Sequence, residues 1–582
     1  MDSRPDPRTD PITLTVISNA LITIAEAMGE ALVRSAFSPN IKERRDCSTA
    51  VFDSTGALIA QAEHIPLHLG SMLGVVQAVL CEFPADTIRP GDAFVANDPY
   101  LGGGTHLPDV TVVSPFFFES SLTGFVANVA HHADIGARVP GGISGDARSI
   151  DEEGLRLGPT RLAAADGPCE EVLRLFESRC RMPEQRRLDL TGQLAANRLG
   201  LARLAELFGK YGAPTLSQAA ADLLEASERR LRAAVSTLPD GSYEASDAVE
   251  GLEGEGLIPI HVRLDVSGDQ FALDFTGSGP PSRGAINVPR NALLATVYYA
   301  IKAGLDPGLP SNAGLHRAIA VAAPEGSILN AQPPSAVGAR TDTCQCVAGC
   351  IIQALSEAMP GRLPAPSNNA STAVVFSGRS CPTGRSCPTG GSCPTGTDSR
   401  TGEEYVYVEA IAGGAGGGPQ ADGLDGVQVH ITNTSNLPVE VLEHAFPLMV
   451  ERYELVQDSG GPGRFRGGLG LRRTIRLTRG SATFSAHGDR HQRPARGAQG
   501  GRPGGLGSYL VKHTDGSTRK LPPKVSGVQL APGTLVEVVT PGGGGWGAPE
   551  KRDPARVAED LRRGIISPGC AEEVYHRKAD SA

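Results

Sequence analysis

The strongest constraint on the fold is that the residue pattern changes along the chain. Residues 168–238 are rich in Leu, Ala, Arg and Glu and poor in Gly, as helical hairpins require. The pattern returns to strands at Gly241 and becomes glycine-rich and strand-rich beyond residue 400. Because 582 residues also exceed the size at which one core keeps growing, we expect a mixed α+β protein with several domains.

These changes of pattern divide the chain into five expected regions. An N-terminal α/β region with a metal site (1–165) precedes a helical hairpin segment (166–240), a second α/β region (241–375), a low-complexity loop (376–400) and a β-rich C-terminal region (401–582). The loop nearly repeats Arg-Ser-Cys-Pro-Thr-Gly three times. Since each thiol is isolated between prolines, we interpret it as an expanded surface loop and not as a cysteine metal site.

Shorter patterns predict individual elements. Asp10-Pro11 offers an N-cap and a first-turn proline to an amphipathic helix that runs to about Phe37. Other apolar patterns predict a hairpin over 47–61 and a second hairpin over 261–275. The remaining expected elements are helical stretches at 67–83 and 292–303 and strands at 94–96, 110–118 and 125–130.

Charge and composition exclude several partners. The formal net charge is -10 and the sequence pI is about 5.8, so the surface repels nucleic acid and anionic membranes. Residues 1–11 are polar and proline-rich, and no uninterrupted apolar run has the length of a membrane span. We therefore expect a cytoplasmic protein.

The 11 cysteines are odd in number and mostly scattered, which is typical of reduced thiols and not of a disulfide framework. Cys344, Cys346 and Cys350 form the tightest group. Apolar residues surround them, so we expect all three to pack inside a buried helix.

Histidines and carboxylates gather in two segments, 97–109 and 128–134, at the ends of predicted strands. The two segments hold three of the 13 histidines of the chain; the candidate residues are Asp98, His106, Asp109, His131, His132 and Asp134. Imidazole and carboxylate ligands suit a divalent ion such as zinc, manganese or iron, and three protein ligands would leave a position open for water or substrate. The alternative is that these histidines only cap strands and form local hydrogen bonds.

Three further residues are candidates for the same site. Asp46 follows two arginines, so it is either another ligand or base, or the partner of Arg44 or Arg45 in a salt bridge. His64 and His68 are four residues apart, and we expect them to meet on one helix face and at most to line a pocket.

Two familiar active-site patterns are missing. The chain contains no Gly-x-x-x-x-Gly-Lys-Ser/Thr stretch and so has no P-loop of its own. The segment Asp458-Ser459-Gly460-Gly461-Pro462 is similar to the nucleophile segment of chymotrypsin-like proteases, but no Ala-Ala-His-Cys segment precedes it. We interpret this similarity as coincidence.

Several motifs together resemble the hydantoinase B/oxoprolinase family, over nearly the whole chain. The motifs are Asn-Asp-Pro-Tyr at 97–100, Gly-Gly-Thr-His-Leu-Pro-Asp at 103–109, His-His-Ala-Asp-Ile-Gly at 131–136, Asp-Phe-Thr-Gly-Ser at 274–278, Pro-Val-Glu at 438–440 with Glu443, the stretch 451–470, and Thr540-Pro541 with the glycine run before Trp546-Gly547. The Asp-Ser-Gly-Gly segment belongs to this pattern.

The resemblance implies a metal held by His106, Asp109 and His131, with Asp46 at an acidic position near the metal. It also implies a larger hydantoinase A-type partner subunit that binds ATP and Mg²⁺ and activates a cyclic amide, whose hydrolysis this chain completes in a hetero-oligomer. The alternative within the family is a subunit of an ATP-dependent ketone carboxylase. Two alternatives lie outside the family: a scaffold without catalytic activity, and a metallohydrolase that works without nucleotide. His132 or Asp134 would orient a ligand or move protons.

Overall fold

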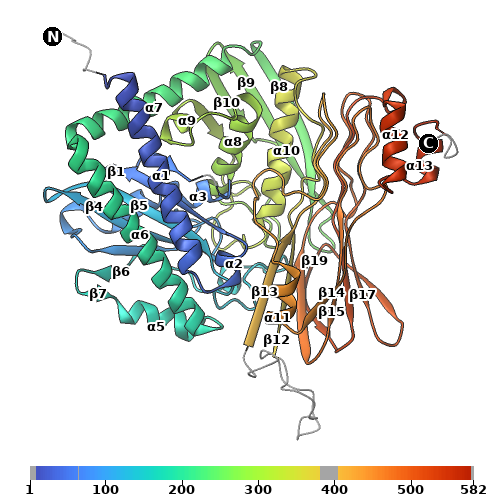
Figure 1. Ribbon diagram of the computed structural model, residues 1–582, viewed down its shortest axis with the longest axis horizontal. Coiled ribbons are helices and arrows are strands. Elements are labelled where there is room, and N and C mark those ends of the chain that lie inside the picture. Colours follow the sequence, from blue (N-terminus) through green and yellow to red (C-terminus); the bar gives the residue numbers. More distant parts are fainter. Residues whose placement is uncertain (1–7, 63, 380–403, 578–582) are drawn as a thin grey trace, which may run out of the picture.

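The computed structural model describes residues 8–62, 64–379 and 404–577. Helices and four sheets alternate along the chain, which confirms the expected mixed α+β fold. In Figure 1 the C-terminal strands lie on the side of the molecule opposite to α1, α5 and α6, and α10 lies between the two groups. The Cys-Pro-Thr-Gly repeat falls outside the described residues.

The N-terminal region is built on a seven-stranded antiparallel sheet with the strand order β2-β1-β5-β4-β3-β6-β7. Its strands are β1 (Cys47–Asp53), β2 (Leu58–Gln61), β3 (Ala93–Ala96), β4 (Asp109–Phe118), β5 (Ser121–His131), β6 (Thr160–Ala164) and β7 (Gly167–Pro168). The expected hairpin over 47–61 and the three expected strands are therefore confirmed.

Helix α1 (Pro11–Ser35) covers this sheet. The Asp10 carboxylate accepts hydrogen bonds from the backbone N–H groups of Ile12 and Thr13, as the sequence predicts. Among the described residues, α1 is the one helix long and apolar enough, by length and composition, to cross a membrane. In this fold one face of it, with Ile17, Leu21 and Met28, is buried against neighbouring elements.

Two short helices follow the first hairpin, where the sequence predicts one helical stretch. Gly74 adopts a left-handed conformation with φ +81° and so separates α3 (His68–Met72) from α4 (Val75–Glu82). Short helices α2 (Pro39–Lys42), η1 (Ala85–Thr87) and η2 (Ile150–Glu152) complete the region. His68 is the first residue of α3, which ends before the break at Gly74.

The expected helical hairpins are α5 (Glu170–Arg179), α6 (Pro183–Tyr211) and α7 (Ala213–Val235). Helix α6 packs along α1 and against β4 and β5 (Figure 1). Gly212, with φ +77°, turns the chain between α6 and α7. The long helices therefore brace the two strands that end at the candidate site.

The second α/β region contains a sheet of order β11-β10-β9-β8 that is covered by α10, and α8 packs against α10. Its elements are β8 (Gly241–Glu250), β9 (Leu257–Ser267), β10 (Gln270–Asp274), α8 (Arg290–Leu305), α9 (Ala313–Arg317), β11 (Ile319–Ala322) and α10 (Arg340–Ala358). The expected hairpin and helix are present. All three cysteines of α10 are buried, as the sequence predicts.

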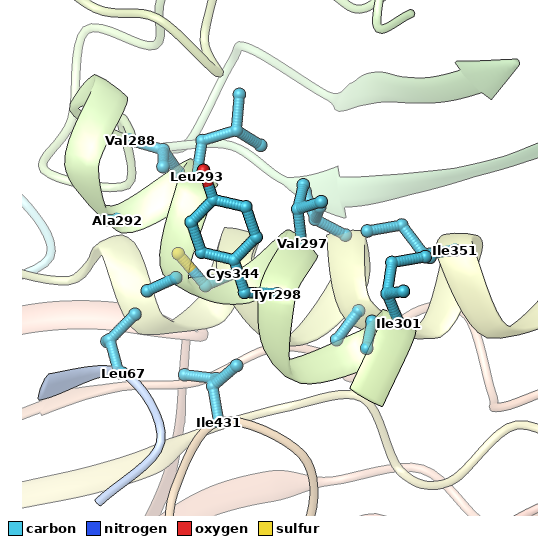
Figure 2. Packing of buried hydrophobic residues seen from close by; sticks show 14 of the residues in the cluster. Leu67, Val288, Ala292, Leu293, Val297, Tyr298, Ile301, Cys344, Ile351 and Ile431 are labelled. Carbon is cyan, nitrogen blue, oxygen red and sulfur yellow. The ribbon is translucent and has the colours of Figure 1, made fainter. Parts of the chain in front are cut away.

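Figure 2 shows how this core joins distant parts of the chain. Val297 and Ile301 of α8 face Ile351 of α10, while Leu67 and Ile431 reach the same cluster from other segments. The backbone N–H of Leu67 also donates to the carbonyl of Ile431. The segments that precede α3 and α11 are thus fixed against the same packed helices.

Two antiparallel sheets form the C-terminal region, with the orders β13-β12-β16-β19 and β14-β15-β20-β17-β18. One apolar cluster, which includes Phe376, Phe484 and Ile475, joins the sheets. The elements are β12 (Thr372–Arg379), β13 (Glu404–Ile411), α11 (Val439–Ala445), β14 (Leu448–Leu455), β15 (Leu471–Leu477), β16 (Ser481–His487), β17 (Ser508–Lys512), β18 (Thr518–Leu521), β19 (Lys524–Leu530), β20 (Leu535–Val539), η3 (Pro549–Lys551), α12 (Pro554–Arg562) and α13 (Pro568–Glu573).

The glycine run before Trp546 packs backbone against backbone. Gly543 donates to the carbonyl of Gly468 and accepts from the N–H of Gly461. A Cβ atom on Gly543 would lie 2.0 Å from the carbonyl oxygen of Ala415. Close approach of extended segments therefore explains why this region needs so many glycines.

Candidate metal centre

The candidate centre lies at one edge of the N-terminal sheet, where β4 begins and β5 ends. Asp109 is the first residue of β4 and His131 is the last residue of β5, and the two are direct partners in the antiparallel register. Directly opposed residues of an antiparallel pair point to the same face of the sheet. Both side chains are buried, so the sheet itself brings an imidazole and a carboxylate together.

The loop before β4 supplies the third group, His106. A Cβ atom on Gly104 would lie 2.7 Å from the carbonyl oxygen of Asp109, so this loop folds tightly only with glycine there. The amide of Asn291, on α8, donates to the carbonyl of Gly104. As a result, ligand atoms of His106, Asp109 and His131 all lie within 4.8 Å of one another.

The contacts of His106 show which ring nitrogen is available. Its Nδ1 lies 3.1 Å from the carbonyl oxygen of Gly338, which can only accept, so Nδ1 carries the hydrogen. Its Nε2 then presents a lone pair to Asp109 Oδ1, 3.1 Å away. Burial, with a contribution from Arg340, lowers the pKa of His106 to about 4. At neutral pH two acceptors therefore face each other, an arrangement that a bound cation would stabilise.

The second oxygen of Asp109 is held by the protein. Oδ2 accepts hydrogen bonds from Thr105 Oγ1 at 2.7 Å and from Arg340 Nη2 at 2.9 Å. Burial alone would raise the pKa of Asp109, but its interactions with His106 and Arg340 outweigh this effect and hold the pKa well below its ordinary value. The carboxylate is therefore ionised and oriented, with Oδ1 turned to the histidines.

His131 is also neutral. Burial, followed by the nearby His106, lowers the pKa of His131 well below its ordinary value. Its Nδ1 lies 3.3 Å from Asn40 Nδ2, and its ring centroid is 5.0 Å from that of His106. Two neutral imidazoles and one carboxylate thus form the cluster, a donor set typical of zinc, manganese or iron sites with an open position.

Asp46 lies in the same cavity but outside the cluster within 4.8 Å. The distance between its Oδ2 and Arg44 Nη2 is 3.9 Å, whereas Arg45 pairs with Glu30 instead. Burial raises the pKa of Asp46, although the charges of His68 and Arg44 oppose this. Asp46 is therefore neither a tight salt-bridge partner nor one of the three clustered groups.

His68 is the residue whose role the sequence underestimates. Its Nε2 lies 3.5 Å from Asp46 Oδ1 and 3.6 Å from Asp109 Oδ1, and its Nδ1 lies 3.2 Å from Ser48 Oγ. The expectation that His64 and His68 share a helix face is wrong, because His64 precedes α3 in an irregular segment. Both line cavities, but only His68 lines the one around the cluster.

Three residues grouped with the cluster in the sequence lie elsewhere. Asp98 binds Arg156, with 2.7 Å between Oδ2 and Nε, and Asp134 pairs with Arg181. His132 follows the last residue of β5, and its Nε2 lies 3.0 Å from Gln193 Oε1. The expectation that His132 or Asp134 orients a ligand or moves protons finds no contact to support it.

Arg340 and Thr105 are functional candidates that sequence reasoning missed. Arg340 is the first residue of α10 and lies 231 positions from Asp109, so spacing gave no signal for it. Thr105 precedes His106 in the glycine-rich loop, and this position was the only sequence feature that pointed to Thr105 as a site residue. Together they bind the carboxylate oxygen that faces away from the histidines.

A cavity of about 70 Å³ opens on the cluster. Its wall combines the N-terminal sheet with Arg340 of α10, Val408 of β13, Thr432 and His487 of β16. A second cavity of about 370 Å³ shares Ile65 and Thr432 with the first. It is lined largely by aromatic and neutral polar side chains, including Tyr298, Tyr299 and His430, and has the size of a small-molecule site.

Comparison with known proteins agrees with this architecture. The family described as hydantoinase B/oxoprolinase matches residues 10–549. The chain is 36% identical to an uncharacterised protein of Methanocaldococcus jannaschii, over 98% of this chain and 96% of the other. It is 32% identical to the B-type subunit of a putative D-/L-hydantoinase of Pseudomonas sp., over 96% and 93% of the two chains. It is 30% identical to 5-oxoprolinase 1 of Arabidopsis thaliana, over 93% of this chain but 42% of that protein.

Two solved structures share the fold. The crystal structure of ATP-dependent caprolactamase from Pseudomonas jessenii has a TM-score of 0.90 at 29% identity and covers 99% of both chains. The nucleotide-free structure of acetone carboxylase has a TM-score of 0.87 at 19% identity, over 97% of this chain and 79% of that one. At that identity the second similarity speaks for the fold alone.

Proposed function

Because the chain belongs to the hydantoinase B/oxoprolinase family, we propose that it is the metal-bearing subunit of an ATP-dependent hydrolase that opens cyclic amides. The observation that carries this proposal is the buried cluster of His106, Asp109 and His131, in which His106 Nε2 lies 3.1 Å from Asp109 Oδ1. With His131 they match a divalent ion such as zinc, manganese or iron. Asp46 is the proposed additional ligand.

The metal would polarise an oxygen or lower the pKa of a bound water. The protein would contribute orientation: Gly338 fixes the tautomer of His106, and Arg340 and Thr105 fix the carboxylate of Asp109. The cyclic amide would occupy the cavity of about 370 Å³, with its amide edge towards the shared wall at Ile65 and Thr432. Aromatic walls with neutral polar groups suit a small ring that carries one amide.

We further propose a hydantoinase A-type partner subunit that binds ATP and Mg²⁺ and activates the amide, in a cytoplasmic hetero-oligomer. The chain has no P-loop sequence. Relatives matched over almost their full length are named as subunits, the beta subunit of caprolactamase from Pseudomonas jessenii among them. The plant 5-oxoprolinase, of which this chain covers 42%, has room for a second functional unit in the same polypeptide.

A hydrolase is favoured over a ketone carboxylase. The relatives at 30% identity or above that carry an activity in their names are hydantoinase, 5-oxoprolinase and caprolactamase. Acetone carboxylase shares only 19% identity. Turnover of a ketone with bicarbonate, and none of a cyclic amide, would reverse this preference.

The test is metal analysis of the purified chain beside His106→Ala and His131→Ala, with His132→Asn as the control because His132 contacts Gln193 and is not one of the clustered groups. We expect bound metal in the wild type and control and little in the two site variants. Equal metal in all four proteins would contradict the site. Amide turnover by a His106→Ala complex with its partner would instead identify the chain as a scaffold, and turnover by the chain without ATP would identify an autonomous hydrolase.

A further inference from the structure

A further histidine reaches the cavity from the C-terminal region. His487 is the last residue of β16, is 2% exposed, and lines the cavity of about 70 Å³ together with His106, Asp109 and His131. It is not among the residues whose ligand atoms cluster within 4.8 Å. His487 therefore borders the same small space without belonging to the cluster.

Asp342 fixes the orientation of this imidazole. Asp342 Oδ1 lies 3.1 Å from His487 Nδ1, and both residues are buried. Burial would raise the pKa of Asp342, but its interactions with Lys524 and His487 lower it, so the group is a carboxylate. A carboxylate only accepts, so Nδ1 carries the hydrogen and Nε2 holds the lone pair.

The lone pair at Nε2 is available for chemistry. No hydrogen bond to it occurs within residues 8–62, 64–379 and 404–577. Nε2 is also not fully covered by protein atoms. Both ring nitrogens of His491, by contrast, are fully covered and have no hydrogen-bond partner. A ring nitrogen that is neither bonded nor covered, on a residue that lines the cavity, is where a proton of a bound molecule would arrive.

The surrounding charges suit a histidine that becomes protonated for part of a reaction cycle. Lys524 Nζ lies 3.5 Å from Asp342 Oδ2 and 3.3 Å from Asp489 Oδ2. Two carboxylates thus face one ammonium group, while Arg490 and Asp247 neutralise each other nearby. The remaining acidic neighbour is Glu250, whose pKa burial raises. An imidazolium at His487 would therefore be balanced by the carboxylate of Asp342.

We infer that His487 is the proton carrier of the cavity and that Asp342 is its positioning residue, an inference that rests on the proposed function. As a water oxygen bonds to the carbon of the phosphorylated amide, Nε2 takes one proton from that water and passes it to the ring nitrogen. The ring C–N bond then breaks and the second proton of the water follows to that nitrogen, which leaves as an amine, while the carbon keeps the phosphoryl group as an acyl phosphate. His487 ends neutral, as it began, and Asp342 stays ionised throughout.

The test uses the chain in complex with its ATP-binding partner. We expect His487→Gln to keep its metal and its KM but to lose roughly 10²- to 10⁴-fold in kcat, the usual contribution of general acid–base catalysis. Added imidazole should restore part of the activity of His487→Gly, which a structural role would not allow. Asp342→Asn should lower kcat less and shift the pH profile. His491→Gln changes a buried imidazole that does not line the cavity and should stay near wild type.

Several outcomes would overturn the inference. The first is a His487→Gln complex whose turnover equals that of the metal-loaded, active wild type. The second is loss of metal from that variant, which would make His487 a metal ligand. If the variants fail to fold, ¹⁵N NMR of His487 in the wild-type chain decides, because an Nε2–H tautomer contradicts the arrangement. A wild-type complex that opens no cyclic amide contradicts the proposed function instead.

Discussion

Two buried His–Asp pairs each present a histidine to the cavity, and they differ in which ring nitrogen meets the carboxylate. In the His106–Asp109 pair Nε2 lies 3.1 Å from the carboxylate and Nδ1 is bound to a backbone carbonyl. In the His487–Asp342 pair Nδ1 lies 3.1 Å from the carboxylate and Nε2 has no hydrogen-bond partner among the described residues. The same residue types at the same distance therefore present opposite chemistry to one space.

The difference teaches what the second contact of a histidine decides. A carbonyl on Nδ1 directs the Nε2 lone pair at a carboxylate, and a cation between the two groups would stabilise the pair. A carboxylate on Nδ1 instead supports an imidazolium and leaves Nε2 to exchange a proton. Each pair has a buried cation behind its carboxylate, Arg340 in one and Lys524 in the other, which keeps that carboxylate ionised.

Among the substitutions that test this comparison, Asp109→Asn should have the largest effect on bound metal and on amide turnover. This change removes the charge that faces His106 Nε2 but keeps the shape of the side chain. We expect bound metal to disappear and amide turnover to fall by more than the ~10–100-fold that loss of a supporting residue costs. Metal analysis and turnover of the complex measure this, with Asp98→Asn as the control outside the cavity. Full metal content in Asp109→Asn would show that the first pair does not need a cation.

A smaller effect should follow from Arg340→Met. The variant removes the positive charge behind Asp109 and the hydrogen bond from Nη2 to Oδ2. We expect metal affinity to fall roughly 10–100-fold, as for other residues that orient a ligand. Titration with a competing chelator measures the affinity, and Arg156→Met, which disrupts a pair outside the cavity, is the matched control. A metal affinity equal to that of the control would show that Arg340 does not support the metal site.

The smallest effect on the metal centre should come from Glu153→Gln. Glu153 Oε1 accepts from the N–H groups of Val337 and Gly338 and so supports the carbonyl that binds His106. Burial raises the pKa of Glu153 from 4.5 to about 8, although those hydrogen bonds oppose the shift. The group is therefore mostly neutral at neutral pH, and Gln should preserve both the contacts and the metal.

The same substitution has a pH signature. Because the folded pKa of Glu153 lies above the unfolded value, its stabilising contribution is complete below pH 4.5 and is lost as the pH rises through about 8. Glu153→Gln cannot titrate, so its urea midpoint should decline less than that of the wild type between those two pH values. The difference should be on the order of a few kcal/mol in unfolding free energy. Parallel pH profiles would contradict a raised pKa.

The sequence by itself determined the local elements and half of the centre. The cap at Asp10, the turn between β1 and β2, and the helical period of residues 168–238 depend on neighbours in the chain, so their patterns were sufficient. His106 and Asp109 are three residues apart in one glycine-rich loop and strand start, and His131 ends the adjoining strand. Short spacing and adjacent strands placed these three among six candidates, and the family resemblance selected them.

Tertiary structure decided everything that depends on segments distant in the chain. Arg340 reaches Asp109 across 231 residues, and His487 reaches Asp342 across 145. The adjacent candidates lie beyond the ends of β3 and β5 and have other partners: Asp98 and Asp134 pair with arginines, because each buried charge needs a specific counter-ion, and His132 contacts Gln193. Sequence spacing fixes the order of side chains along one element, but only the packing of α10 and β16 around the sheet determines which nitrogen and which oxygen meet.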